Sequence, residues 1–393
     1  TGITVTGEVA SSQDYPNFRP TLDFNFTAVK KLDPRITYQR TGPASFVNEF
    51  GHLVSVGDNT PRFDHDPITR ESKGLLIEES RTNIVYNASG ASNGTFTENI
   101  ANSLTGKNDA FKMVKNSSSV SQSHINYNIS GNGSTTGFVA SVFVQKTNHS
   151  RYFLQMVSSN VTDNFYVYYN VDDGGTSATD FGSPNNNITS TRSIESYGDN
   201  WYRLIVRVQG FAQNTFNSFR VGLGHPTSGA QGYQDTTDEL IAYGAQIEVG
   251  DFVTSYIPTN GVAAATRGAD ETYIDGQDFL DFYNQTEGTV ISSHSILPNI
   301  PSNHNLYTYQ ISPTGATAYA PLRILDKNSS IANSIAVASV YNNGYSFLSL
   351  DTGNPATVAG RKYVIALSVK KDYYDAVFDG GDLLTDSSGD LFT

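Results

Sequence analysis

Short segments in which apolar and polar residues alternate constrain the fold of this chain more than any other feature. Residues 201–208 place their even-numbered apolar side chains on one face of an extended strand, namely Tyr202, Leu204, Val206 and Val208. Arg203 and Arg207 fall on the opposite face, so this strand is predicted to be half buried. Similar segments recur between clusters of Gly, Asn and Asp, and none keeps a period of 3.6 residues. We therefore predict an all-β protein built from a jelly roll and a second β-sandwich.

The 393 residues divide by pattern into four parts. In residues 1–86, repeated X-Pro pairs favour extended backbone, which predicts an N-terminal arm for attachment that packs on the next domain or on neighbouring subunits. Residues 87–258 are predicted to form the jelly roll, 259–281 a linker, and 282–393 the second sandwich. One strand of this sandwich is predicted to bury alternate residues: Tyr363, Ile365, Leu367 and Val369. The sequence stops soon after a turn at 379–381, so this sandwich is interpreted as incomplete or completed by another chain.

The charge balance and the absence of long apolar segments argue against two classes of partner. The formal net charge is −13, and no run of Lys or Arg follows the chain, so nucleic acid is not an expected partner. No segment of 18 apolar residues occurs, and the first residues lack the features of a signal peptide, so membrane insertion is not expected. Without Cys, stability has to come from packing and from oligomerisation.

The titratable residues do not form a recognisable catalytic motif. The seven His residues are scattered, with no pair at zinc-binding spacing and no nucleophile elbow or phosphate-binding loop elsewhere. The segment Asp64-His65-Asp66 could hold a cation or titrate near neutrality, but alternation should point His65 away from both carboxylates. We therefore interpret Arg62, Asp64 and Asp66 as forming turn and interface hydrogen bonds. The chain is predicted not to be an enzyme and to have no metal site.

Glu78, Glu79 and Arg81 are interpreted as a salt-bridged structural element that takes part in assembly. Two carboxylates could also hydrolyse a glycosidic bond, but they must flank a cleft, and adjacent strand residues face opposite sides. A polysaccharide depolymerase is therefore the minor alternative.

Aromatic residues next to Asn and Asp predict a sugar-binding site in the jelly roll, because aromatic faces stack on sugar rings and amides bond their hydroxyls. The candidates are Tyr166, Tyr168, Trp201, Tyr233, Asn170 and Asp172. Trp201 begins a strand, which favours a packing role, and the two tyrosines at 166 and 168 share a strand face that is either core or platform. Calcium at the acidic turns, Asp172–Asp173 or Asp235, is the one cofactor considered; no other is expected.

Three segments of the arm closely resemble the N-terminal signature of a widespread group of phage and prophage structural proteins, described as tail-fibre-like or head-fibre-like. They are residues 32–38 (LDPRITY), 61–67 (PRFDHDP) and 74–83 (GLLIEESRTN). In that group the signature precedes a carbohydrate-binding-module-like jelly roll, and its closing pattern resembles residues 243–250 (YGAQIEVG), 254–259 (TSYIPT) and 266–270 (TRGAD). The region after Phe282 resembles a concanavalin-like, laminin-G-type sandwich.

This resemblance implies a tail-fibre-type structural protein on the exterior of a phage particle. Its sandwiches are expected to bind host-surface glycans or other virion proteins, and the chain is expected to form a homo-oligomer, with a trimer as the expected state. A capsid decoration or head-fibre protein with the same modules is the alternative that sequence does not separate from the first.

Overall fold

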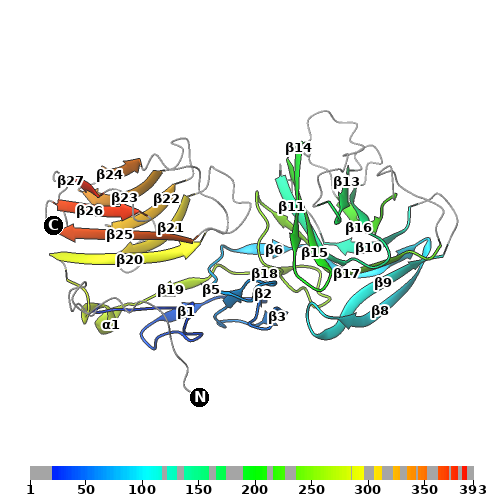
Figure 1. Cartoon of the computed structure of the whole chain (residues 1–393), viewed down its shortest axis with the longest axis horizontal. Coiled ribbons are helices and arrows are strands. Elements are labelled where there is room, and N and C mark those ends of the chain that lie inside the picture. Colours follow the sequence, from blue (N-terminus) through cyan, green and yellow to red (C-terminus); the bar gives the residue numbers. More distant parts are fainter. Residues whose placement is uncertain are drawn as a thin grey trace, which may run out of the picture.

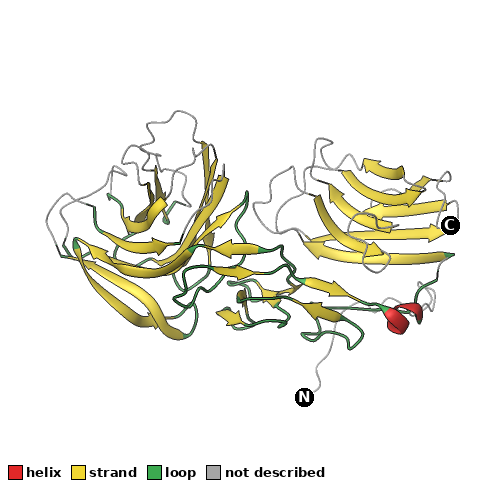
Figure 2. Ribbon diagram, turned by 180° about the vertical axis from the view of Figure 1, so that it is seen from behind, coloured by secondary structure: helices red, strands yellow, loops and turns green. Residues whose placement is uncertain are grey.

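The fold is seen in a computed structural model of the chain, which describes residues 20–116, 122–130, 137–158, 165–173, 189–209, 216–225, 236–284, 286–295, 305–311, 322–327, 334–341, 344–351, 362–370, 373–378 and 383–386. Within these residues, strands dominate and the one helix is the short α1 (Gly276–Leu280) (Figure 2). The predicted all-β class is confirmed. The described residues contain no helix that is long and apolar enough to cross a membrane.

Two antiparallel sheets form the predicted jelly roll, one lobe of Figure 1. The five-stranded sheet runs β13-β12-β16-β10-β7, with β7 (Val85–Ser92), β10 (His124–Ile129), β12 (Arg151–Ser158), β13 (Phe165–Asn170) and β16 (Phe216–Leu223). The six-stranded sheet runs β14-β15-β11-β17-β9-β8, with β8 (Gly94–Asn102), β9 (Lys107–Lys115), β11 (Gly137–Gln145), β14 (Thr189–Ser196), β15 (Trp201–Gln209) and β17 (Glu239–Val249).

The core lies between these sheets and is filled by alternate residues of facing strands. Leu204, Val206 and Val208 of β15 and Leu154 and Met156 of β12 all belong to it and are fully buried, as alternation predicts. The prediction that β15 is half buried is wrong, however. Its opposite face is also covered, and Arg203 is only 4% exposed, because the segment after β17 packs there: Arg203 donates to the Thr254 carbonyl, and Val253 clusters with Ile205.

The arm consists of short strands that pack on the outer face of the six-stranded sheet. Its strands are β1 (Thr37–Gln39), β2 (Ala44–Val47), β3 (Leu53–Val56), β4 (Phe63–His65), β5 (Ser72–Leu75) and β6 (Arg81–Asn83), with β2 paired to β3 and β4 to β5. Val47 and Leu53 of the arm cluster with Phe143 and Trp201 of the sheet. Burying one such side chain contributes about 1.5–3 kcal/mol, so the arm acts as part of the jelly roll of its own chain.

The predicted linker at 259–281 is largely structured, which corrects the sequence interpretation. Its strands β18 (Ala265–Arg267) and β19 (Glu271–Tyr273) pair with β6 and β1 of the arm. The chain therefore returns from the jelly roll to the arm before it continues. Alternation could not reveal this, because strands of three residues are too short to show a period.

The second sandwich contains two four-stranded sheets and forms the other lobe of Figure 1. One sheet has the order β20-β25-β26-β27, with β20 (Glu287–Ser295), β25 (Lys362–Lys370), β26 (Tyr373–Phe378) and β27 (Leu384–Asp386). The other has the order β21-β22-β23-β24, with β21 (Asn305–Ile311), β22 (Leu322–Lys327), β23 (Ser334–Tyr341) and β24 (Gly344–Asp351). The four residues predicted to share the buried face of β25 are all buried: Tyr363, Ile365, Leu367 and Val369.

Candidate functional site

A buried ion network joins the arm to the segment that follows the jelly roll. It consists of Arg40, Arg62, Glu78, Arg267 and Asp270, whose side chains are at most 2% exposed. The Arg62 guanidinium lies between the two carboxylates: its Nη1 donates to Glu78 Oε2 at 2.6 Å, and its Nη2 donates to Asp270 Oδ2. Arg267 reaches Glu78 at 3.0 Å, and Arg40 reaches Asp270 at 3.3 Å. Each buried carboxylate thus faces two guanidinium groups.

Glu78 is held in its ionised form by this arrangement. Burial alone would raise the pKa of the carboxyl, but the charges of Arg267 and Arg62 outweigh it and lower the pKa to about 2. Ser255 adds a hydroxyl donor at 2.6 Å and a backbone N–H donor at 2.7 Å. The backbones also pair, since the Asp270 N–H donates to the Glu78 carbonyl at 2.9 Å. Removing any one charge would leave another one buried and poorly compensated.

The predicted assembly residues form contacts within this chain. Arg62 and Glu78 pair with each other, and Arg81 pairs with Glu79 rather than with Glu78. Asp66 forms the predicted turn, because its Oδ1 accepts hydrogen bonds from Ile68 N and Thr69 N, both at 2.9 Å. These contacts describe a folded unit, and the proposed role of the residues between subunits stays a prediction.

The expected separation of Asp64 from His65 is not found. Asp64 Oδ1 accepts from Val47 N at 2.8 Å, and His65 Nδ1 lies 3.1 Å from the carbonyl oxygen of the same residue. The cause is a register shift between Asp64 and His65 in the pairing of β4 with β5, which breaks the alternation of side chains. Burial raises the pKa of Asp64.

The outer face of the five-stranded sheet carries a row of polar side chains across its strands. In cross-strand register, Tyr166 (β13) lies opposite Gln155 (β12), which lies opposite Arg220 (β16), which lies opposite Asn126 (β10). Arg220 Nε donates to Asn126 Oδ1 at 3.1 Å, and its Nη1 donates to Gln155 Oε1 at 3.3 Å. Gln155 Nε2 in turn donates to the Tyr166 hydroxyl at 2.6 Å. We call these four residues the polar row.

A second row on the same face is mostly aromatic. Tyr168, Phe153, Gly222 and His124 follow one another in register. The Phe153 ring lies over Gly222, where a Cβ would come within 2.3 Å of it, so only glycine fits there. His124 is 5% exposed, and neither of its ring nitrogens has a hydrogen-bond partner among the described residues. Burial, followed by the charge of Arg220, lowers the pKa of His124 to about 4, so its ring is neutral at neutral pH.

The predicted sugar-binding residues do not form one site. Tyr166, Tyr168 and Asn170 lie on β13, but Trp201 lies in the six-stranded sheet, buried against the arm with Nε1 donating to Ser103 Oγ at 3.0 Å. The packing alternative is therefore correct for Trp201. Tyr168 is 3% exposed and packs against Phe153, which leaves Tyr166 as the accessible aromatic of the pair. Tyr233 lies outside the described residues.

Asn170 and the acidic turn after it bind each other. Asn170 Nδ2 donates to Asp173 Oδ2 at 2.8 Å, and Asp172 is paired with Lys146. The hydrogen bond from Lys146 lowers the pKa of Asp172. Among the described residues, no group of three or more His, Asp or Glu side chains is arranged to hold a metal ion. The calcium expectation at Asp235 concerns a residue outside the described ranges.

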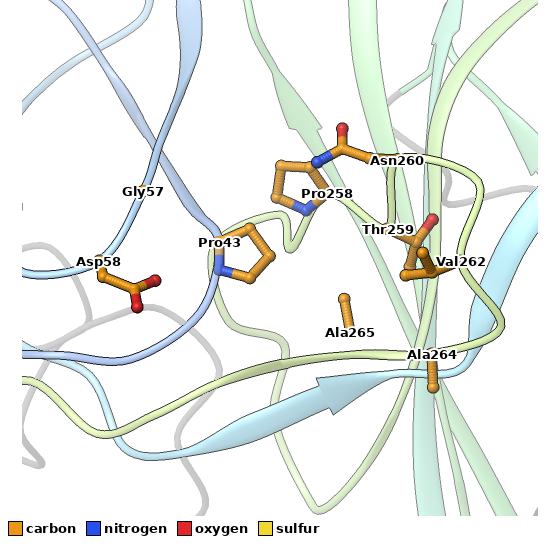
Figure 3. Close-up of a pocket in the computed structure, with 9 residues that line it drawn as sticks. All are labelled: Pro43, Gly57, Asp58, Pro258, Thr259, Asn260, Val262, Ala264 and Ala265. Carbon is orange, nitrogen blue, oxygen red and sulfur yellow. The ribbon is translucent and has the colours of Figure 1, made fainter.

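An open cleft of about 410 Å³ lies where the arm meets the end of the jelly roll (Figure 3). It is lined by Pro43, Gly57, Asp58, Pro258, Thr259, Asn260, Val262, Ala264 and Ala265. Its one carboxylate, Asp58, already accepts a hydrogen bond from Gly42 N at 2.9 Å. The lining is otherwise small and weakly polar, so the cleft offers few groups that could orient a ligand.

Sequence reasoning missed Arg220, Gln155, Asn126 and His124 as site residues. The signal for Arg220 was the alternation in residues 218–223, where Phe219, Val221 and Leu223 face the core. Which strands would flank Arg220 could not be read from the sequence, because β10, β12 and β16 lie far apart in the chain.

No family model matches the chain, and no curated protein matches it. Among solved structures, the fold is similar to domains LG4-5 of the mouse laminin alpha1 chain, with 11% sequence identity and a TM-score of 0.20. The alignment covers 70% of this chain and 78% of that chain. At this identity and TM-score the likeness supports no inference about ligands or partners, and the β-sandwich architecture rests on the sheets described above.

Proposed function

We propose that this chain is a structural protein of a bacteriophage particle, of tail-fibre type, and that its jelly roll attaches the particle to glycans on the host surface. In this proposal the protein lies on the exterior of the virion and forms a homo-oligomer, with a trimer as the expected state. It acts by binding and assembly, without bond cleavage and without a cofactor.

The buried ion network is the observation that carries this proposal. Three of the segments that resemble phage structural proteins supply four of its five members: Arg62 comes from 61–67, Glu78 from 74–83, and Arg267 and Asp270 from 266–270. Ser255, which donates to Glu78, comes from 254–259. A buried set of opposite charges is stable only when its members are present together. Segments that lie far apart in the sequence, and that resemble phage structural proteins, therefore meet in one folded unit. This supports a shared architecture with those proteins and argues against chance matches of short segments.

The attachment role is supported by the chemistry of the two outer faces of the jelly roll. The arm and the segment after β17 together cover the outer face of the six-stranded sheet. The outer face of the five-stranded sheet carries the polar row, in which the partly exposed ring of Tyr166 lies beside hydrogen-bonding groups, and this combination suits a sugar. A glycan array with the full chain tests this role, and binding of some glycans but not others is expected.

Immunogold labelling of intact particles of the phage that encodes the chain tests the proposed location. Label at the tail is the expected result. Label spread over the capsid would reject the tail-fibre assignment in favour of the decoration or head-fibre alternative, which the same modules would serve. Absence of label from particles whose other surface proteins are labelled would reject a virion role altogether.

A further inference from the structure

Arg220 is a positioned cation without an anionic partner among the described residues. Its Nε and Nη1 are bound to the amide oxygens of Asn126 and Gln155, and no described carboxylate forms an ion pair with it. The side chain is half buried. In a chain of net charge −13, a guanidinium that is held in place by two neutral amides and not by an acid leaves its charge for a ligand.

The hydrogen bonds of the polar row have a fixed direction that follows from this arginine. A guanidinium only donates, so the oxygen of Gln155 faces Arg220 and the amide nitrogen faces Tyr166. The Tyr166 hydroxyl accepts from Gln155 and also from Gln122 at 3.3 Å. Both contacts use its oxygen as the acceptor, so its hydrogen is left to donate. The row thus presents two donors, Arg220 Nη2 and the Tyr166 hydroxyl, to a ligand above the sheet.

His124 lies one row away from Arg220 on the same face. It is 5% exposed, and both of its ring nitrogens are buried without a hydrogen-bond partner among the described residues. Because these nitrogens are covered, the groups of this face that a ligand reaches directly are Arg220 and Tyr166, which are partly exposed.

We infer that the outer face of the five-stranded sheet binds an acidic glycan, one whose sugars carry a carboxylate, as uronic and sialic acids do. The inference rests on the proposed attachment function and specifies its ligand class. The carboxylate pairs with Arg220, and a neighbouring oxygen of the sugar accepts from Tyr166. Phe153 and Tyr168 support the row from the adjacent register position.

Binding of the full chain to acidic polysaccharides and to their carboxyl-reduced forms tests this inference. Polygalacturonate, hyaluronan and polysialic acid serve as probes, and reduction of each carboxylate to an alcohol keeps the polymer but removes the charge. The unmodified polymer that binds is expected to lose about 10- to 100-fold in affinity on reduction, the range of a charge-assisted hydrogen bond. The substitution Arg220→Gln is expected to cause the same loss for the acidic polymer.

Two further variants distinguish the loss of a ligand-binding charge from the loss of the folded structure. Asn126→Asp keeps an oxygen beside Arg220 Nε but gives the arginine an internal carboxylate, so it should weaken acidic-glycan binding without lowering the melting temperature. Lys112→Gln removes one positive charge from β9 of the other sheet, where Lys112 pairs with Glu239 at 2.6 Å, and should leave binding unchanged. Unfolded variants would be recognised by their melting temperatures and excluded.

The outcomes distinguish a wrong ligand class from a wrong attachment role. Equal binding to acidic and reduced polymers, or acidic binding that survives both Arg220→Gln and Asn126→Asp, would overturn the acidic specificity and leave glycan attachment standing. Binding only of neutral glycans on the array would do the same. No binding to any glycan, acidic or neutral, would overturn both the inference and the proposed attachment role.

Discussion

The two outer faces of the jelly roll each carry an arginine in mid-strand, and the two arginines are satisfied in different ways. Arg203 on β15 is 4% exposed, donates to Ser141 Oγ at 3.0 Å and to the Thr254 carbonyl at 2.8 Å, and lies over the Phe143 ring. Arg220 on β16 is half buried and is bound by two side-chain amides. The segment after β17 covers the first arginine, while the second lies on the face that we propose for ligand binding.

This difference assigns two roles to the two faces of one jelly roll: the covered face stabilises the fold, and the other face is proposed to recognise a ligand. The covered face uses its charges internally: in the buried ion network every arginine is paired with a carboxylate, and Glu248 is hydrogen bonded to Thr254. The other face keeps a cation, Arg220, that no carboxylate among the described residues neutralises. Substitutions on the covered face should therefore change the free energy of unfolding, and substitutions in the polar row should change binding.

Removing the arm should have the largest effect of all. A chain that begins at Ile84 keeps β7 but uncovers Phe143 and Trp201 and leaves Asp270 without Arg62 and Arg40. The expected loss exceeds about 5 kcal/mol, so the cooperative unfolding transition of the jelly roll should disappear. Urea denaturation followed by tryptophan fluorescence measures this, since Trp201 is the single Trp of the chain. A truncated protein with an unchanged transition would show that the arm is only an appendage.

Replacing Arg62 with Met should have the next largest effect. The substitution keeps an apolar stem but leaves Glu78 and Asp270 with one guanidinium each. Removing one partner from a buried ionic set costs about 3–5 kcal/mol, measured as the free energy of unfolding in urea. Arg35→Met is the matched control, because Arg35 pairs with Asp33 within the arm and the two side chains are 35% and 26% exposed, so its loss should be much smaller. Similar losses in both variants would contradict the special role of the network.

Much of the local structure, but little of this network, could be predicted from the sequence. The alternation in residues 201–208 and 363–369 identified the buried faces of β15 and β25 correctly. The Asp66 turn was also predictable, because an Asp side chain bonds backbone N–H groups two and three residues ahead. Such signals are local, and each depends on residues within one strand or turn.

The remaining features depend on contacts between distant segments. The ion pair between Arg62 and Asp270 joins an arm residue to a segment that the sequence predicts to be a linker. No local sequence pattern indicates this pairing. Tyr166 and Trp201 both lie in strands that contain several aromatic residues, yet the two strands belong to different sheets. The alternation of apolar and polar residues within a strand does not predict which strands will pair with it. The polar row was missed for the same reason, since it exists only once three separate strands lie in register.

The covered face should also show a pH dependence that originates at Glu78. Its folded-state pKa is lowered from 4.5 to about 2, so its ionised form stabilises the fold fully above pH 4.5, and this stabilisation is lost as the pH falls through about 2. Glu78→Gln should therefore cost about 1.5–3 kcal/mol at pH 7, and the difference from the native chain should shrink as the pH falls from 4.5 towards 2. Urea denaturation at a series of pH values measures it. A difference that does not vary with pH would show that Glu78 is not the titrating group.

The smallest effect on stability is expected for the arginine of the polar row, and it tests the comparison most directly. Arg203→Gln removes hydrogen bonds to Ser141 and to the Thr254 carbonyl in a covered site, so it should cost about 1–2 kcal/mol. Arg220→Gln should cost less, about 0.5–1 kcal/mol, because Arg220 is only half buried and Asn126 is partly exposed and can bond water instead, so that only the buried Gln155 loses a partner. Equal losses in the free energy of unfolding for the two substitutions would mean that Arg220, like Arg203, serves to stabilise the fold. A loss confined to Arg203→Gln would mean that the polar row contributes little to stability, as a surface kept for a ligand requires.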